Sequence, residues 1–364
     1  MRELLDSVTL HDIDLPSGVH FSELTQAYAM YGEPDSEKSN VILVCHALTG
    51  GHRLAGEPIE GTPDPWWNTL VGDGKCIDTK RYCILCFNNI GSPYGSTCPA
   101  SINPETGRKY QMDFPIVTPR DIAYAQKKAA EKLGFDKFRV VIGGSMGGMV
   151  AYELAISFPE ITDQLAVIAA PDRLYPQAIG LNTVQRQAIM NDPEWKNGYY
   201  EGKGPVNGLA AARMLAMITY RSEKSFSHRW MRDMVDESDR SWDSKFQVES
   251  YLEHHGETLV KRFDANCYLY LTKMMDFHDI GTGRGGLEEA WKRFAGKKLL
   301  TVGISSDMLF PNWQVEEAVR IAGRCGVDAR YEEIESDNGH DSFLIDFDQL
   351  DDFLRSFICN IYYD

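Results

Sequence analysis

Short apolar runs alternate with helix-like stretches over much of the chain. The runs lie at 40–45, 81–87, 139–142, 164–168, 298–303 and 329–334. Runs of this length, bounded by turn residues, are typical of buried parallel strands. Helical patterns fill 119–134, 146–158 and 313–325. This order predicts an α/β fold, with a mostly parallel sheet that is covered by helices on both faces.

The alternation stops between 172 and 295, where only helical periodicity remains, as in 209–220 and 248–263. An insertion of this size between two strands is most simply a helical cap over the carboxyl ends of the strands, the edge at which open α/β sheets bind ligands. We therefore expect a core made of residues 1–171 and 296–364, and a cap made of residues 172–295.

Composition and charge narrow the class of function. The 364 residues are 43% hydrophobic and 25% charged, and the formal net charge is -16. Such a charge repels nucleic acids and anionic membrane surfaces, so we expect neither as a partner. Residues 1–15 are acidic and lack the apolar segment of a signal peptide, and no run approaches 18 apolar residues. These features indicate a cytoplasmic enzyme whose eight cysteines are reduced.

The strongest chemical signal is GGSMGG at 143–148, between the apolar run at 139–142 and the helical pattern that follows. A G-x-S-x-G motif between a strand and a helix is typical of the nucleophile elbow of the α/β-hydrolase fold. Gly143 and Gly147 let the crowded backbone turn, so that Ser145 projects alone. The amide of Met146, at the start of the helix, is then expected to face a developing oxyanion.

A serine nucleophile needs a base, and the base needs an orienting acid. In this fold the acid and then the histidine follow the serine along the chain. His340 follows the last predicted strand and Asp307 follows the strand at 298–303, so both are expected at the carboxyl edge of the sheet. Asp337 is a competing choice for the acid, but it lacks the strand-end position. His254 and His255 lie in a polar helical stretch and are expected at the surface.

A second oxyanion donor should come from a loop after an earlier strand. Residues 45–51, with the sequence CHALTGG, follow the first apolar run, and the amide of Leu48 is the candidate donor. An ordinary tight turn is the alternative.

Two further motifs are expected to carry no chemistry. Cys83 and Cys86 have C-x-x-C spacing, but they lie in a predicted strand, where residues three apart face opposite ways. The sequence GTGRGG at 281–286 fits G-x-G-x-x-G but follows a helical pattern rather than a strand, so it is interpreted as a return loop from cap to core. No zinc-type motif is present, and we expect no metal and no permanently bound cofactor.

The chain resembles homoserine O-acetyltransferases over nearly its whole length, in core and cap alike. The resemblance rests on motifs that include HALTG (46–50), IGGSMGGM (142–149), GLAAARMLAMITYRSE (208–223), RFDANCYLYLT (262–272), SSDMLFP (305–311) and NGHDSFL (338–344). It implies that Ser145 takes an acetyl group from acetyl-CoA and passes it to L-homoserine for methionine synthesis. It also implies a homodimer formed through the cap.

Site residues carry over by position. The resemblance implies a triad of Ser145, Asp307 and His340 and an oxyanion hole of Leu48 and Met146. Arg213 and Tyr220 match residues that hold the amino acid, and Asp341 matches the group that receives its ammonium. These charges suit a zwitterion, because a carboxylate needs a cation and an ammonium needs an anion.

Two positions depart from the family pattern. Val150 stands where Gln is common and Cys98 where Gly is usual, and both are expected near the pocket. They leave the acyl donor open, with succinyl-CoA as the alternative to acetyl-CoA. An esterase or thioesterase whose cap admits water is a further alternative.

Overall fold

A computed structural model describes residues 2–359 of the chain. Eight strands form one sheet in the order β1-β2-β6-β3-β7-β8-β9-β10. Their bounds are β1 Glu3–Asp14, β2 His20–Tyr31, β3 Val41–Cys45, β6 Cys83–Phe87, β7 Val140–Gly144, β8 Gln164–Ile168, β9 Lys298–Ile304 and β10 Asp328–Ile334. A separate two-stranded sheet pairs β4 (Val71–Gly72) with β5 (Ile77–Asp78).

The strands from β6 to β10 run parallel, as the apolar runs predict. Their side chains alternate between two buried clusters. In β6, Cys83 belongs to the cluster on one face and Cys86 to the cluster on the other. All eight cysteines are free thiols. The C-x-x-C spacing therefore brings together no pair of thiols, because the pleat sends these two side chains apart.

The antiparallel pair β1 and β2 was not predicted. Both strands are twelve residues long and are exposed along part of their length, so polar residues interrupt their apolar positions. β2 joins the parallel strands through antiparallel pairing with β6. A half-exposed strand of this kind lacks the continuous apolar run that marks the buried strands.

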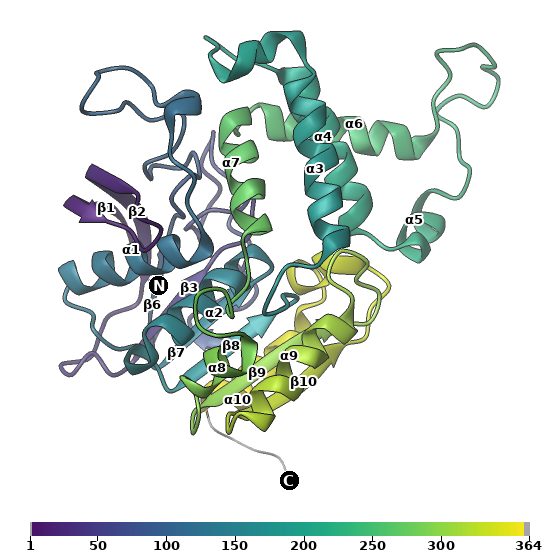
Figure 1. The fold of residues 1–364 in the computed structure, drawn as a ribbon. Coiled ribbons are helices and arrows are strands. Elements are labelled where there is room, and N and C mark those ends of the chain that lie inside the picture. Colours follow the sequence, from purple (N-terminus) through teal and green to yellow (C-terminus); the bar gives the residue numbers. More distant parts are fainter. Residues whose placement is uncertain (1, 360–364) are drawn as a thin grey trace.

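Helices cover both faces of the sheet (Figure 1). Helices α1 (Pro119–Lys132), α2 (Met146–Ser157) and α9 (Asn312–Arg324) pack into one buried cluster. Helix α10 (Phe347–Cys359) and residues 54–77 pack into the cluster on the opposite face. Helix α8 (Leu287–Lys292) and the short 3-10 helices η1 (Gln111–Asp113), η2 (Pro159–Ile161) and η4 (Gly339–Leu344) complete the core. The α/β fold class is confirmed.

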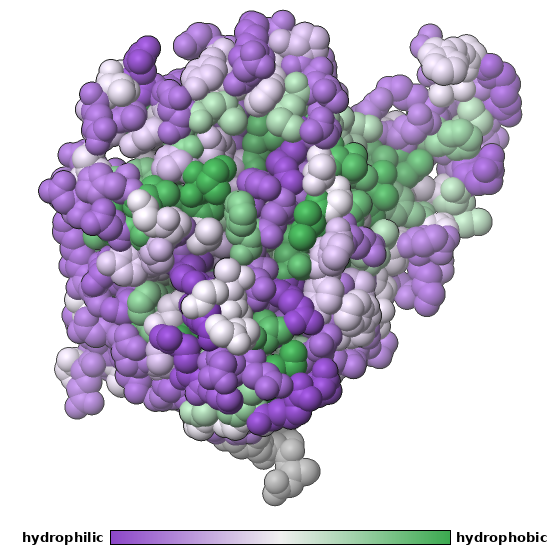
Figure 2. Space-filling model, in the orientation of Figure 1, coloured by the Kyte–Doolittle hydropathy of each residue, from purple (hydrophilic) through white to green (hydrophobic). Residues whose placement is uncertain are grey.

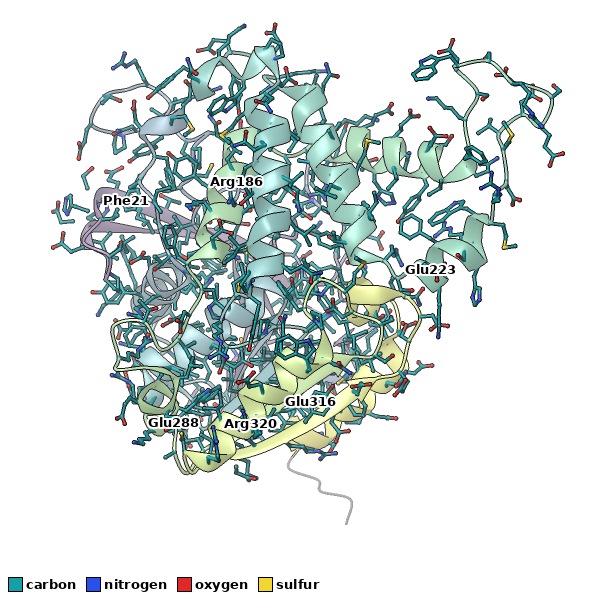
Figure 3. The ribbon with its side chains drawn as sticks, turned by 45° about the vertical axis from the view of Figure 1, so that its right-hand side comes forward. Phe21, Arg186, Glu223, Glu288, Glu316 and Arg320 are labelled. Carbon is teal, nitrogen blue, oxygen red and sulfur yellow. The ribbon has the colours of Figure 1, made fainter. Side chains whose placement is uncertain are left out.

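Helices α3 to α7 stand together above the carboxyl ends of the strands (Figure 1). Their bounds are α3 Pro176–Met190, α4 Val206–Tyr220, α5 Glu223–Trp230, α6 Gln247–Val260 and α7 Ala265–Asp276, with the 3-10 helix η3 at Pro193–Gly198. Arg186 of α3, labelled in Figure 3, donates to Asp276 of α7 across 2.6 Å. The domain limits at 171/172 and 295/296 stay a prediction.

Two segments of this region differ from the rest. Residues 231–246 form an arm between α5 and α6 that projects from the body (Figure 1). Residues 281–286 follow helix α7 and precede α8, so the strand that a dinucleotide-binding loop requires is absent there. Over residues 2–359, no helix combines the length and the hydropathy that a membrane span requires.

Candidate active site

Ser145 lies at a sharp turn between β7 and α2. Its φ is 54°, in the left-handed region, and its ψ is -125°. A Cβ on Gly143 would lie 2.2 Å from the carbonyl oxygen of Gly147, and one on Gly147 would lie 2.1 Å from the carbonyl oxygen of Cys45. Only glycine fits at these two positions. The strained turn thus holds Ser145 above the sheet, at the amino end of α2.

Three side chains from distant parts of the chain meet above this turn. His340 Nε2 lies 2.8 Å from Ser145 Oγ, and His340 Nδ1 lies 2.6 Å from Asp307 Oδ2. The other oxygen of Asp307 accepts hydrogen bonds from the amides of Leu309 and Phe310, at 2.8 and 2.9 Å. The carboxylate is held from both sides. This chain of contacts can draw the serine proton toward the imidazole.

Asp337, the competing acid, lies elsewhere. It is exposed, and its Oδ1 accepts from Lys224 Nζ at 3.1 Å. Asp307 follows β9, and His340 lies in η4 after β10. The strand-end positions that favoured Asp307 are therefore the ones that bring it to the histidine.

The electrostatics of His340 suit a base. Burial alone would lower its pKa, but the charge and hydrogen bond of Asp307, together with the charge of Asp341, outweigh burial and raise the pKa above the ordinary value. With Asp307 at Nδ1, the proton of the neutral ring stays on that nitrogen. Nε2 is then left as the acceptor that faces the serine hydroxyl.

The loop after β3 presents the amide of Leu48, and His46 fixes its direction. The carbonyl of Ala47 accepts from His46 Nδ1 at 2.8 Å and from the amide of Gly50 at 3.1 Å. In a trans peptide the N–H points opposite to the C=O, so the Leu48 amide faces away from both donors. Leu48 lines the pocket, and Met146 lies directly after Ser145 in α2.

His46 owes its orientation to a buried network that sequence reasoning did not identify. Its Nε2 accepts from the amide of Asn89 at 2.9 Å, and Asn89 Oδ1 accepts from Gln126 Nε2 at 2.9 Å. Burial lowers the pKa of His46 to about 4, so the ring is neutral at physiological pH. Two features of the sequence could have indicated this role of His46: its position directly after a strand and its place in the HALTG motif.

The site opens into a pocket of about 450 Å³ between core and cap. Its lining includes Ser145, His340, Leu48, Arg213, Tyr220 and Asp341, so six of the eight predicted site residues share one cavity. Met146 is buried beside the pocket, and Asp307 lies behind His340.

Arg213 and Tyr220 lie seven residues apart in α4 and so share a helix face. The Arg213 guanidinium carbon lies 5.5 Å from the centre of the Tyr220 ring. Nη1 of Arg213 is buried without a hydrogen-bond partner in the part of the chain that the structure describes. A buried unpaired guanidinium N–H is costly, which favours an anionic group of a ligand at this position.

Asp341 supplies the opposite charge. Its Oδ2 lies 3.9 Å from Arg221 Nε. Burial raises its pKa, while the charges of Arg221, His340 and Arg213 act in the other direction. The pocket therefore carries a cation and a carboxylate on different walls, an arrangement suited to a zwitterion.

Four sequence expectations need comment. His254 is exposed as expected, but His255 is half-buried and lines the pocket, so its assignment to the surface was wrong. The cap helix α6 turns this histidine toward Arg213, and burial lowers its pKa to about 4. Val150 is fully buried in α2 and Cys98 lines a different cavity, so neither contacts this pocket.

The pocket wall also contains Arg262, a residue that sequence reasoning did not single out. No group of three or more His, Cys, Asp or Glu side chains suited to a metal ion occurs within residues 2–359.

Known proteins share both the sequence and the fold. The profile of the alpha/beta hydrolase fold family matches residues 40–347. The homoserine O-acetyltransferase of Moorella thermoacetica is 47% identical over 95% of this chain and 93% of its own, and that of Symbiobacterium thermophilum is 46% identical over 94% and 91%. The homoserine O-acetyltransferase structure from Bacillus anthracis superposes with a TM-score of 0.91 at 28% identity, covering 98% of each chain.

A solved esterase is also similar, with a TM-score of 0.90 and 26% identity over 98% of this chain and 100% of its own. Fold similarity alone therefore does not separate transfer from hydrolysis, and the family assignment rests on the extent of sequence identity. The chain belongs to the homoserine O-acetyltransferase family of the α/β hydrolase fold.

Proposed function

We propose that this protein transfers the acetyl group of acetyl-CoA to the hydroxyl of L-homoserine through an acyl-Ser145 intermediate. The observation that carries the proposal is one pocket that contains Ser145, paired with His340, together with Arg213 and the Asp341 carboxylate. Among the described residues, Nη1 of Arg213 has no hydrogen-bond partner. The similarity to homoserine O-acetyltransferases, 47% identity over 95% of this chain in one case, supports the same reaction.

In the first half-reaction, Ser145 Oγ attacks the thioester carbonyl while His340 Nε2 takes the hydroxyl proton. The carbonyl oxygen becomes an oxyanion, which the amides of Leu48 and Met146 stabilise. The carbon–sulfur bond then breaks, and the thiol leaves with the proton from His340. An acetyl ester on Ser145 remains.

In the second half-reaction, the hydroxyl of homoserine replaces the thiol. His340 takes its proton, the oxygen attacks the acetyl ester, and the bond to Ser145 breaks as the proton returns to Oγ. Arg213, with Tyr220 packed against it, receives the carboxylate of homoserine, and Asp341 receives its ammonium. Fixing both charged groups on the α-carbon of the acceptor raises the effective concentration of its hydroxyl over that of water.

Hydrolysis is the competing outcome, because the same acyl-enzyme can react with water. The similarity to a solved esterase favours it as the second candidate function. Succinyl-CoA is the alternative donor. The cap decides between water and alcohol by limiting the access of water to Ser145.

One assay separates these reactions: thiol release from acetyl-CoA and from succinyl-CoA, each with and without L-homoserine. We expect release that depends on homoserine and is faster with acetyl-CoA. Ser145→Ala should lower turnover by several orders of magnitude and leave the unfolding midpoint close to that of the wild type. Equal thiol release with and without the acceptor would eliminate the transferase.

Assembly and location are part of the same proposal. A homodimer formed through the cap follows from the resemblance and is supported by the apolar residues that the cap exposes, among them Ile218 and Met231. The eight free thiols support residence in the cytoplasm, where cysteines stay reduced. We also retain 172–295 as the cap domain and the rest as the core.

A further inference from the structure

Arg262 connects the cap to the loop that carries Leu48. It lies in the short junction between α6 and α7 and lines the active-site pocket. Its Nη1 donates to the carbonyl oxygen of Thr49 at 2.9 Å and also to the hydroxyl of Tyr94. The acceptor carbonyl belongs to the residue that follows Leu48. That carbonyl shares a peptide with the Gly50 amide, which donates to the carbonyl of Ala47. A cap residue thus holds the peptide that is hydrogen-bonded to the one carrying the proposed oxyanion donor.

The junction that carries Arg262 is anchored by its neighbours. Phe263 is buried, and its ring meets the ring of Tyr94 edge-on at 5.8 Å. Asp264 caps α7 by accepting from the amide of Cys267 at 3.0 Å, and its other oxygen accepts from the hydroxyl of Tyr200. Because the backbone on this side is fixed, the guanidinium of Arg262 can act as a stable support.

The core holds the opposite side of the same loop. His46 and the amide of Gly50 fix the carbonyl of Ala47, as described above. These two bonds determine the tilt of the peptide that contains the Leu48 amide. The Gly50 amide shares its peptide with the Thr49 carbonyl, and that carbonyl has no core donor among the hydrogen bonds of the described residues. Arg262 supplies that donor from the cap.

We propose that Arg262 is a positioning residue for acyl-enzyme formation, which holds the Thr49 carbonyl so that the Leu48 amide stays directed at the oxyanion. The proposal rests on the proposed function, since it deepens the first half-reaction. It also gives the cap a role before the acceptor binds. The cap then serves the acetyl donor step as well as the selection of homoserine.

Two other roles would fit a cation at this position. Arg262 could bind the carboxylate of homoserine, in which case its loss would affect only the second half-reaction. It could also serve only to fasten the cap, in which case its loss would lower stability and every substrate would suffer alike. Two results distinguish these roles from loop positioning. One is the half-reaction that slows when Arg262 is replaced, and the other is whether a lysine at the same position restores the rate.

The test uses rapid mixing of the full-length enzyme with p-nitrophenyl acetate in the absence of homoserine, so that the burst of p-nitrophenol reports acylation of Ser145. Arg262→Met should slow the burst by about tenfold to a hundredfold, less than or comparable to the loss of one oxyanion donor. Arg262→Lys, which retains a donor for the Thr49 carbonyl, should recover much of the rate. In both variants, the ester concentration that gives half of the maximal burst rate should stay nearly unchanged.

Arg293→Met is the matched control. Arg293 also donates to backbone carbonyls, those of Ile156 and Ser157, but it is exposed and lies outside the pocket. We expect its burst rate to equal that of the wild type. Unfolding midpoints of all three variants, measured in urea, separate a loss of stability from a loss of rate.

An unchanged burst in Arg262→Met, with only the KM for homoserine raised, would overturn the proposal in favour of acceptor binding. Equal slowing in Arg262→Met and Arg262→Lys, accompanied by lower unfolding midpoints, would overturn it in favour of simple fastening. Failure of the proposed transferase is visible separately, because the wild type would then release thiol without homoserine while the burst comparison still stands.

Discussion

Asp307 determines the pKa at which His340 can act as a base. The carboxylate keeps the pKa of His340 raised against the effect of burial. The ring must be neutral to accept the serine proton, so acylation should decline as pH falls through this raised pKa. We expect Asp307→Asn to move the acid limb to lower pH, because burial then lowers the pKa with less opposition. The rate at the plateau should fall by about 10³- to 10⁴-fold.

The measurement is the pH profile of the p-nitrophenyl acetate burst for both proteins. An acid limb at the same pH in the variant would show that Asp307 does not control the titration. Asp337→Asn is the control, since its carboxylate pairs with Lys224, and its profile should match that of the wild type.

Arg213 offers a second prediction for a single residue. Its Nη1 has no hydrogen-bond partner among the described residues. If the substrate carboxylate is that partner, replacing the guanidinium removes a charge-assisted hydrogen bond to homoserine. Arg213→Met should raise the KM for homoserine by about 10- to 100-fold and leave the acylation burst near the wild-type rate. Arg213→Lys should lie between the two, because an ammonium lacks the planar fork. Unchanged use of homoserine in both variants would remove Arg213 from the acceptor site.

Individual residues differed in how far the sequence could predict them. Ser145, Asp307 and His340 follow strand ends in a fixed order, and their side chains do lie in contact, although their roles stay a proposal. His255 and Arg262 belong to the cap, and their direction depends on how α6 seats on the core. Helical periodicity gives the spacing of such residues along a helix but not which neighbour each one meets.

At the level of elements, the crossing of α2 over β3 depends on Gly147. A methyl group there would lie 2.1 Å from the Cys45 carbonyl oxygen and 2.9 Å from that of His46. Helix and strand would have to separate, so Gly147→Ala should lower the free energy of unfolding by at least about 2 kcal/mol. Urea denaturation followed by circular dichroism measures the change.

Gly180 gives a control of opposite sign. It is exposed within α3, and a Cβ there would meet no atom within 4 Å. Gly180→Ala should therefore raise the free energy of unfolding by up to about 1 kcal/mol, because alanine is the better helix former. Equal and small effects at both positions would contradict the close packing of α2 on β3.

The elements themselves were predictable where burial was complete. The strands β3, β6 and β7 are buried throughout, so their runs stand out in the sequence. The parallel edge strand β10 was also predicted, although most of its residues are exposed or only partly buried. β1 and β2 alternate buried and exposed positions and include acidic residues, and α10 lies beyond the last run, so none of the three was identified. A strand or helix that packs on one side only gives a weaker pattern, and its place in the sheet depends on distant partners such as β6.

For the whole molecule, the loss of strand alternation after 172 predicts a large helical insertion, and helices α3 to α7 do fill that stretch. The arm at 231–246 was not foreseen, because charged and polar residues dominate it and its few apolar residues form no extended pattern. Contacts such as the one between Arg186 and Asp276 fix the packing of the cap, and they join residues ninety positions apart. Such pairs leave no local signal.

The arm and the neighbouring part of the cap expose large apolar side chains, which contact water when the chain is alone. Trp242 is 99% exposed, Met231 74% and Ile218, on α4, 43%. Figure 2 shows hydrophobic residues gathered on the cap beside the arm. Full burial of each large apolar side chain stabilises by about 1.5 to 3 kcal/mol, so pairing of two caps would recover a substantial free energy. The resemblance to the family points to a second copy as the occupant.

We therefore expect sedimentation velocity to give the mass of two chains. Ile218→Asp combined with Met231→Glu should shift the protein to one chain, because two carboxylates would be buried at the contact. Ile102 is exposed on the surface of the α/β core, outside the cap, so Ile102→Asp should leave the assembly unchanged. Since each chain carries a formal charge of -16, the dimer should tighten as salt screens the repulsion between subunits. A single-chain mass for the wild type at all salt concentrations would contradict this assembly.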